Sequence, residues 1–167
     1  NPNGPRHVHT AVIAEIYIRD DSRTELVCER IGAKFAGHKA DVHFCGDPSG
    51  GKRNTVDTSN DWDVVRQCLR NYFPVVRDRV CRRAPPVIDS ANSVNARMLN
   101  ARGEVRFAID PTAAPQTVLD LEGVVWEEEN QERVIDKSDL GRTHWADSLR
   151  YYVHDKHPLG GARTVNE

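Results

Sequence analysis

The stretch Asp41-Val-His-Phe-Cys-Gly-Asp-Pro-Ser-Gly-Gly-Lys52 decides how the rest of the chain is interpreted. Its apolar first half predicts a short buried strand over residues 42–45. That strand stops at Asp47, because Pro48 cannot donate a hydrogen bond to a sheet and the glycines that follow allow a sharp turn. A carboxylate is therefore expected at the carboxyl end of a strand, which is the edge where open α/β sheets bind ligands.

Four interpretations of this turn compete. Gly46-x4-Gly51-Lys52 nearly matches the phosphate loop G-x-x-x-x-G-K-[ST], but Arg53 replaces the hydroxyl that holds Mg²⁺, and loop-forming residues follow it. Gly-Asp-Pro-Ser-Gly-Gly also resembles the nucleophile loop of serine proteases, although Pro48 splits that motif and no convincing His and Asp partners precede it. In the third interpretation, Asp47 is a metal ligand. In the fourth, Asp-Pro-Ser-Gly makes a tight turn and does nothing else.

Length and composition set the class of protein. The chain has 167 residues, 38% of them hydrophobic and 29% charged, which predicts one globular α/β domain with its own core. No apolar run approaches membrane-spanning length and no signal peptide is recognisable. The chain opens with Asn1 rather than Met, so we expect a fragment or an excised domain.

The distribution of charge limits how the chain could hold nucleic acid. The formal net charge of −2 argues against electrostatic binding of nucleic acid by the whole surface, but it permits binding by a local basic region. The middle of the chain is basic, through Arg66, Arg70, Arg77, Arg79, Arg82, Arg83 and Arg97. An acidic group follows later at residues 127–129 and 132. An ordinary solvated surface would account for either group equally well.

The four cysteines are scattered singly, at positions 28, 45, 68 and 81. None has C-x-x-C spacing, so the sequence predicts neither a zinc site nor a redox motif. Apolar neighbours surround Cys28, Cys45 and Cys68, which we interpret as small core residues in a reducing, cytoplasmic setting.

Hydrophobic periodicity predicts alternating strands and helices, and hence a layered α/β fold. Strands are expected at residues 8–18, 42–45, 75–80, 105–109 and 134–135. Helices are expected at residues 22–35, 61–72 and 90–100, from Pro111 or Pro115 to about residue 126, and from Thr143 onward. Ser22 or Thr24 is predicted to cap the first helix, Asn60 the second and Thr143 the last. The acidic segment after Trp126 is typical of a loop, and the tail after about residue 157 is expected to be loose.

A second carboxylate stands in the last predicted helix, Thr143-His-Trp-Ala-Asp-Ser-Leu-Arg-Tyr-Tyr-Val-His154. An apolar stripe is built by Trp145, Leu149, Tyr152 and Val153. Asp147 is predicted to lie opposite that stripe, and His144, Tyr151 and His154 are predicted to share its side. An exposed aspartate near a helix N-terminus is also favourable without any function, because it complements the helix dipole.

Six stretches occur in a fixed order along the chain: Gly46-Asp-Pro-Ser-Gly50, Asp89-Ser-Ala-Asn-Ser-Val-Asn-Ala-Arg-Met-Leu99, Phe107-Ala-Ile-Asp-Pro111, Asp120-Leu-Glu-Gly-Val124, Asp136-Lys-Ser-Asp139 and His144-Trp-Ala-Asp-Ser-Leu-Arg-Tyr151. This ordered set resembles the C-terminal nuclease domain of the tailed-bacteriophage terminase large subunit, over roughly residues 13–152. The resemblance implies a single nuclease domain across residues 1–167, with an RNase H-like mixed sheet flanked by helices.

The resemblance also implies a site in which acidic residues hold two divalent cations, Mg²⁺ or Mn²⁺, that cut DNA. Asp47 and Asp147 match the family's metal-binding aspartates, and we expect their carboxyl groups to meet in space. His144 matches a third ligand or a group that orients the site, and Lys137 matches a lysine that contacts the scissile phosphate or a water. The family's first-strand aspartate, which should precede Glu15, is not found in this chain.

The implied partners follow from the same resemblance. Ser49, Lys52 and Arg53 are candidate contacts to the backbone of double-stranded DNA, and a portal protein and a small terminase subunit are the expected protein partners. The implied location is the cytoplasm of a bacterial host, with no membrane association. Two alternatives stay open, namely a nucleotide-binding domain that uses residues 46–52, and a non-catalytic module that docks to DNA or to a portal.

Overall fold

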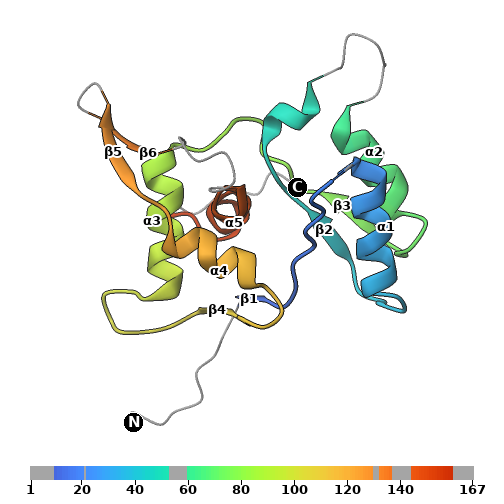
Figure 1. Ribbon diagram of the computed structural model, residues 1–167, viewed down its shortest axis with the longest axis horizontal. Coiled ribbons are helices and arrows are strands. Elements are labelled where there is room, and N and C mark those ends of the chain that lie inside the picture. The colour runs from blue at the N-terminus through green and yellow to red at the C-terminus, as the bar shows by residue number, and fades with distance from the viewer. Residues whose placement is uncertain (1–9, 21, 53–59, 130–131, 137–143, 160–167) are drawn as a thin grey trace. The chain divides into compact units, whose positions relative to one another are not determined.

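The computed structural model describes residues 10–20, 22–52, 60–129, 132–136 and 144–159. These residues contain five α-helices, one short 3-10 helix and six short strands, which confirms the predicted mixed α/β class. The chain divides into two compact units (Figure 1), one formed by Asn1–Glu15 with Pro85–Glu167 and the other by Ile16–Ala84. No described helix has the length and apolar character needed to cross a membrane.

The smaller unit packs two helices on a pair of parallel strands. β2 (Val42–Phe44) pairs in parallel with β3 (Val76–Asp78), and α1 (Thr24–Lys34) packs against α2 (Asp61–Leu69). The buried core consists of Cys28, Phe44, Leu69 and Phe73. Burial raises the pKa of the Cys28 thiol to about 11, with nearby Cys68 adding to the effect, so this thiol stays neutral as a small core residue.

The larger unit holds the remaining elements. β1 (Thr10–Val12) pairs in parallel with β4 (Phe107–Ile109), and β5 (Trp126–Glu129) forms an antiparallel pair with β6 (Glu132–Ile135). Its helices are α3 (Val87–Met98), α4 (Pro115–Glu122) and α5 (His144–Lys156). As Figure 1 shows, α5 lies against both α3 and α4, and its Val153 is buried with Val94 and Phe107 in the core.

The described strands form three separate two-stranded sheets, β1–β4, β2–β3 and β5–β6. The structure therefore supports the coarse α/β class, while one RNase H-like mixed sheet stays a proposal. The single nuclease domain expected across residues 1–167 likewise stays a prediction.

Several expectations about single elements are wrong. The acidic segment predicted to be a loop forms β5, and Trp126, predicted to end a helix, is the first residue of that strand. The helix predicted over residues 90–100 ends at Met98, and Leu99, whose backbone is extended, is 63% exposed. α1 has Arg23 at its N-cap without a side-chain cap, so neither Ser22 nor Thr24 caps it.

Two expected caps have different outcomes. Asn60 caps α2 as predicted, since its side-chain oxygen accepts a hydrogen bond from the amide of Asp63 at 3.0 Å. Thr143, the predicted cap of the last helix, lies outside the described residues.

The first strand, predicted to reach residue 18, ends at Val12, and Glu15 lies beyond it and hydrogen-bonds to the start of α4. Its amide donates to the carbonyl of Ala113 at 3.1 Å. Its Oε1 accepts from the amide of Gln116, and its Oε2 accepts from the amide and hydroxyl of Thr117, all at 2.9 Å. These are amides that the first turn of α4 leaves without intrahelical partners. Glu15 therefore acts as a long-range cap of α4.

We expect Glu15→Ala to lower the free energy of unfolding of the chain by about 1–2 kcal/mol, because two amides and a hydroxyl of α4 lose their acceptor. Urea denaturation followed by circular dichroism measures this loss. Glu122→Ala, which removes an exposed carboxylate at the other end of the same helix, should change stability by less than about 0.5 kcal/mol. Equal losses in the two variants would contradict the capping role.

Candidate functional site

Asp47 lies three residues after the end of β2 and is the N-cap of the short 3-10 helix η1 (Pro48–Gly51). Its Oδ1 accepts a hydrogen bond from the amide of Ser49 at 2.7 Å, which fixes the carboxylate next to the backbone of the turn. Both residues are exposed. The carboxylate therefore stands at the carboxyl end of a strand, as predicted, and it also shapes the turn that follows it.

Trp62 of α2 holds this turn in place. Its indole Nε1 donates to the carbonyl oxygen of Asp47 at 3.0 Å, and its ring stacks on Phe44 with ring centres 6.0 Å apart. Gly46 and Gly50 let the backbone approach the indole, since a Cβ would lie 2.5 Å from Trp62 Cη2 at Gly46 and 2.9 Å from Trp62 Nε1 at Gly50. The glycines predicted from sequence as turn formers thus have a second role, which is to seat the loop against the core.

The same loop differs from a phosphate-binding loop. In that motif, the lysine belongs to the start of a helix that follows the glycines without a break. Here Lys52 is exposed and extended, with φ −74° and ψ 132°, and the next described helix, α2, begins at Asp61. Arg53 lies outside the described residues.

Asp147 lies in the first turn of α5, where a buried arginine holds it. The Nε of Arg150 donates to Asp147 Oδ1 at 2.7 Å, and the two side chains are 7% and 19% exposed respectively. The Nη1 of Arg150 donates to the hydroxyl of Ser90 in α3 at 3.0 Å, and the guanidinium carbon lies 4.9 Å from the centre of the Tyr151 ring. The carboxylate is therefore positioned by an ion pair that is largely removed from water.

A third carboxylate accepts a hydrogen bond from the first turn of α5. Asp120 of α4 is buried, and its Oδ2 accepts a hydrogen bond from the amide of Ala146 at 2.8 Å. From sequence, Asp120 stands out only as part of a stretch, because spacing along the chain does not show which helix a distant carboxylate reaches. Arg150 was also missed, although its i, i+3 spacing from Asp147 is a pattern typical of ion pairs on a helix.

The rest of the predicted constellation on α5 is only partly realised. His144 is exposed at the first helical position, on the same turn as Asp147. Tyr151, predicted to share the polar side, is buried. His154 is half-buried, with its Nδ1 3.3 Å from the Ser93 hydroxyl. The predicted polar side was too wide because α5 packs against two helices, which bury more of its surface than the apolar stripe alone.

The structure does not test whether the two candidate metal-binding aspartates meet. Asp47 belongs to the smaller unit, whereas Asp147 and His144 belong to the larger unit. Within the described ranges, no three His, Cys, Asp or Glu side chains gather in a way that could hold a metal ion. Lys137 lies outside the described residues, so its predicted role is also untested.

A second Asp-Pro turn repeats the geometry of the first. Asp110 follows β4, and its Oδ1 accepts from the amide of Thr112 at 2.9 Å and from the hydroxyl of the same residue at 2.7 Å. These hydrogen bonds lower the pKa of the Asp110 carboxyl below its ordinary value. The sequence signal for this similarity is the repeated Asp-Pro-Ser or Asp-Pro-Thr motif after a strand.

The basic middle of the chain offers less free positive charge than its composition suggests. Arg66 forms ion pairs with Asp63 at 2.6 Å and with Asp78 at 2.5 Å, and hydrogen bonds to these carboxylates raise its pKa. Arg77 pairs with Asp41 at 2.7 Å.

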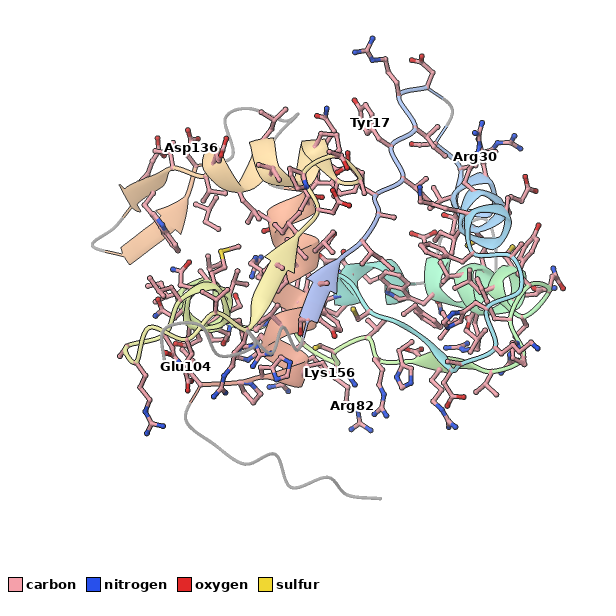
Figure 2. All side chains as sticks on the ribbon, turned by 90° about the horizontal axis from the view of Figure 1, so that it is seen from below. Tyr17, Arg30, Arg82, Glu104, Asp136 and Lys156 are labelled. Carbon is pink, nitrogen blue, oxygen red and sulfur yellow. The ribbon has the colours of Figure 1, made fainter. Side chains whose placement is uncertain are left out.

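Arg97 and the pair Arg82 and Arg83, which belong to the same basic group, differ in their exposure to solvent. Burial and the nearby charge of Arg106 lower the pKa of Arg97, whose Nη2 donates to the Arg106 carbonyl at 3.2 Å. Arg82, labelled in Figure 2, and Arg83 are exposed.

Comparison with known proteins assigns no family or function to the chain. No family model, no curated protein and no solved structure matches the chain. The site is therefore judged from its own residues.

We expect Gly46→Ala to destabilise the chain by about 1–3 kcal/mol, because the new Cβ would overlap the Trp62 ring and disturb its packing on Phe44. Thermal unfolding followed by tryptophan fluorescence measures the change. Gly51→Ala is the matched control in the same loop, since its Cβ would lie 3.6 Å from Trp62 Cδ1, an ordinary contact. If the two variants were equally stable, Trp62 would not be the anchor of the loop.

We expect Arg150→Met to lower the free energy of unfolding by about 3 kcal/mol, because Asp147 would keep a largely buried charge without its partner. Arg106→Met removes an ion pair of the same length, 2.7 Å, to Glu104, but both of its side chains are 42% exposed. This control should cost no more than about 1 kcal/mol. Chemical denaturation of both variants separates the two cases, and a small loss for Arg150→Met would show that burial of this pair contributes little.

Proposed function

We propose that this chain is a metal-dependent DNA endonuclease domain of the terminase type, with an RNase H-like fold, that cuts concatemeric viral DNA. The observation that carries the proposal is that both matching aspartates stand at the ends of core-anchored elements, each held by a specific contact. Ser49 donates to Asp47, and Arg150 donates to Asp147. The second support is the ordered set of sequence stretches that resembles the terminase nuclease family.

Fixed carboxylates suit metal catalysis because a cation site works only when its ligands are held near their final geometry. The turn of Asp47 is seated on Trp62, and α5 is fixed by the buried side chain of Val153. Groups that hydrogen-bond to metal ligands commonly orient them and tune their affinity. Ser49 and Arg150 are placed to do this for Asp47 and Asp147.

The donor chemistry fits Mg²⁺ or Mn²⁺. Both are hard cations that prefer carboxylate oxygen and water. Asp47 and Asp147 offer such oxygens, and His144 is exposed beside the second of them. The assembly of these groups into one site is part of the proposal.

In this proposal, two divalent cations would supply an activated water and neutralise charge at the leaving oxygen of the phosphodiester. Asp47 and Asp147 would bind the cations, His144 would serve as a third ligand or orient the site, and Lys137 would contact the scissile phosphate.

The remaining proposed contacts serve substrate binding. The exposed Ser49 and Lys52, together with Arg53, would contact the backbone of double-stranded DNA, without reading its sequence. A portal protein and a small terminase subunit are the proposed protein partners, in a bacterial host.

A non-catalytic module that docks to DNA or to a portal is the second candidate. It is favoured by one specific observation: Asp47 and Asp147 already hydrogen-bond to Ser49 and Arg150, contacts that stabilise the fold without any metal. Such a module would bind DNA without cutting it, whichever metal is supplied. Nucleotide binding through residues 46–52 has less support, since Lys52 does not begin a helix.

We expect Asp47→Asn and Asp147→Asn each to reduce Mn²⁺-dependent nicking of plasmid DNA by ~10²-fold or more, because a neutral amide neutralises the cation poorly. In Asp47→Asn the side-chain amide oxygen could still accept the Ser49 hydrogen bond, so loss of activity would report on metal binding rather than on the shape of the turn. A supercoiled-plasmid assay with purified protein and Mn²⁺ measures the rates.

Asp110→Asn is the matched control, because it changes the same kind of Asp-Pro turn outside the proposed site. Nicking by this variant should stay within about twofold of the unsubstituted chain. Full activity in Asp47→Asn would defeat the assignment of that residue. DNA binding with no nicking by the unsubstituted chain would instead favour the docking module.

A further inference from the structure

The larger unit contains a cavity of about 160 Å³ that no proposed step of DNA cleavage uses. Elements α3, α4, β5, β6 and α5 and the segment between α4 and β5 surround it. It is lined by Ala91, Val94, Asn95, Leu121, Val124, Trp126, Ile135, Ala146 and Arg150. All of these residues belong to one unit, so the cavity does not depend on how the two units are placed.

Most of the cavity wall is apolar, and one residue gives it aromatic character. Val94 and Ile135 are buried, whereas Trp126 is 40% exposed and so lies where the cavity meets solvent. An indole offers a flat face on which another ring can stack, a contact that adds to simple burial of apolar area. A cavity of about 150 Å³ with apolar walls is known to be large enough for benzene.

The polar part of the wall is the guanidinium of Arg150. This side chain is 7% exposed, so it lies on the inner wall. Its Nε is used by Asp147 and its Nη1 by Ser90, while no hydrogen bond of Nη2 is present among the described residues. Nη2 is not one of the fully buried side-chain atoms that lack a partner, so its donor is open to an acceptor on a bound group.

The charge of Arg150 does not by itself favour an anion. The ion pair with Asp147 at 2.7 Å already balances the positive charge, and an added carboxylate would compete with Asp147. An uncharged acceptor such as a carbonyl oxygen would not compete with Asp147 for the positive charge. Asn95, an exposed residue of the cavity wall, supplies a side-chain amide at the outer side that can both donate and accept.

We propose that this cavity binds one small, uncharged aromatic ring that carries a hydrogen-bond acceptor, with the ring against Trp126 and the acceptor facing Arg150 Nη2. The inference does not rest on the nuclease proposal, since it uses only the cavity wall. The two are linked at one residue, because the guanidinium that meets the ligand also holds Asp147.

Benzamide is the probe, since it combines one ring with a carbonyl acceptor. Titration of benzamide into the ¹⁵N-labelled full chain should give saturable shifts of the amides of Ala91, Val94 and Ala146 and of the Trp126 indole, with a Kd on the order of 1 mM. Benzene, which has the ring without the acceptor, should bind at least about fivefold more weakly.

Ala91→Leu should fill the cavity and weaken benzamide binding by about tenfold or more, without touching Arg150 or Asp147. Asn92→Leu is the matched control, since it places the same side chain at the neighbouring exposed position of α3 and should change the Kd by less than about twofold.

Shifts that do not saturate or that lie elsewhere would overturn the proposal, as would equal affinity for benzene. Should Ala91→Leu fail to fold, two measurements on the unsubstituted chain still test the proposal: the positions of the amides that shift with benzamide, and the affinity for benzene. Because no nicking is measured, failure here leaves the nuclease proposal untouched.

Discussion

The larger unit depends on how the buried guanidinium of Arg150 is satisfied. Removing an arginine from water is costly unless its charge is paired and its N–H groups are hydrogen-bonded. Asp147 balances the charge, Ser90 accepts from Nη1, and the Tyr151 ring lies 4.9 Å from the guanidinium carbon. One residue thus joins α5 to α3, orients a candidate metal ligand and lines a cavity, so packing and chemistry are coupled at this point.

The carboxylates of the chain divide by the kind of donor that they meet. Glu15 and Asp120 satisfy amides at the starts of α4 and α5, while Asp47 and Asp110 accept from amides in their own turns. These contacts satisfy amides that helix starts and tight turns leave without backbone partners. Asp147 differs because its partner is a largely buried cation. A search for functional aspartates by residue type alone would not distinguish these roles.

The sequence could predict features that depend on near neighbours. The strand before Asp47, the cap of α2 by Asn60 and the part of the α5 stripe formed by Leu149, Tyr152 and Val153 follow from local periodicity and hydrogen bonding, and the structure contains all three. The sequence could not predict β5, because a run of glutamates has low strand propensity and β5 forms by pairing with β6.

Local chemistry could be predicted from the residues alone: an aspartate at a strand end, an aspartate at a helix start, and the glycines between the first of these and Lys52. Which distant groups come into contact follows only from the packing of the folded chain. Trp62 reaches the Asp47 turn across 15 positions, Asp120 reaches α5 across 26, and Arg150 reaches Ser90 across 60. The physical reason is that spacing along the chain specifies contacts only within a turn or a helix, whereas longer contacts depend on how the helices pack.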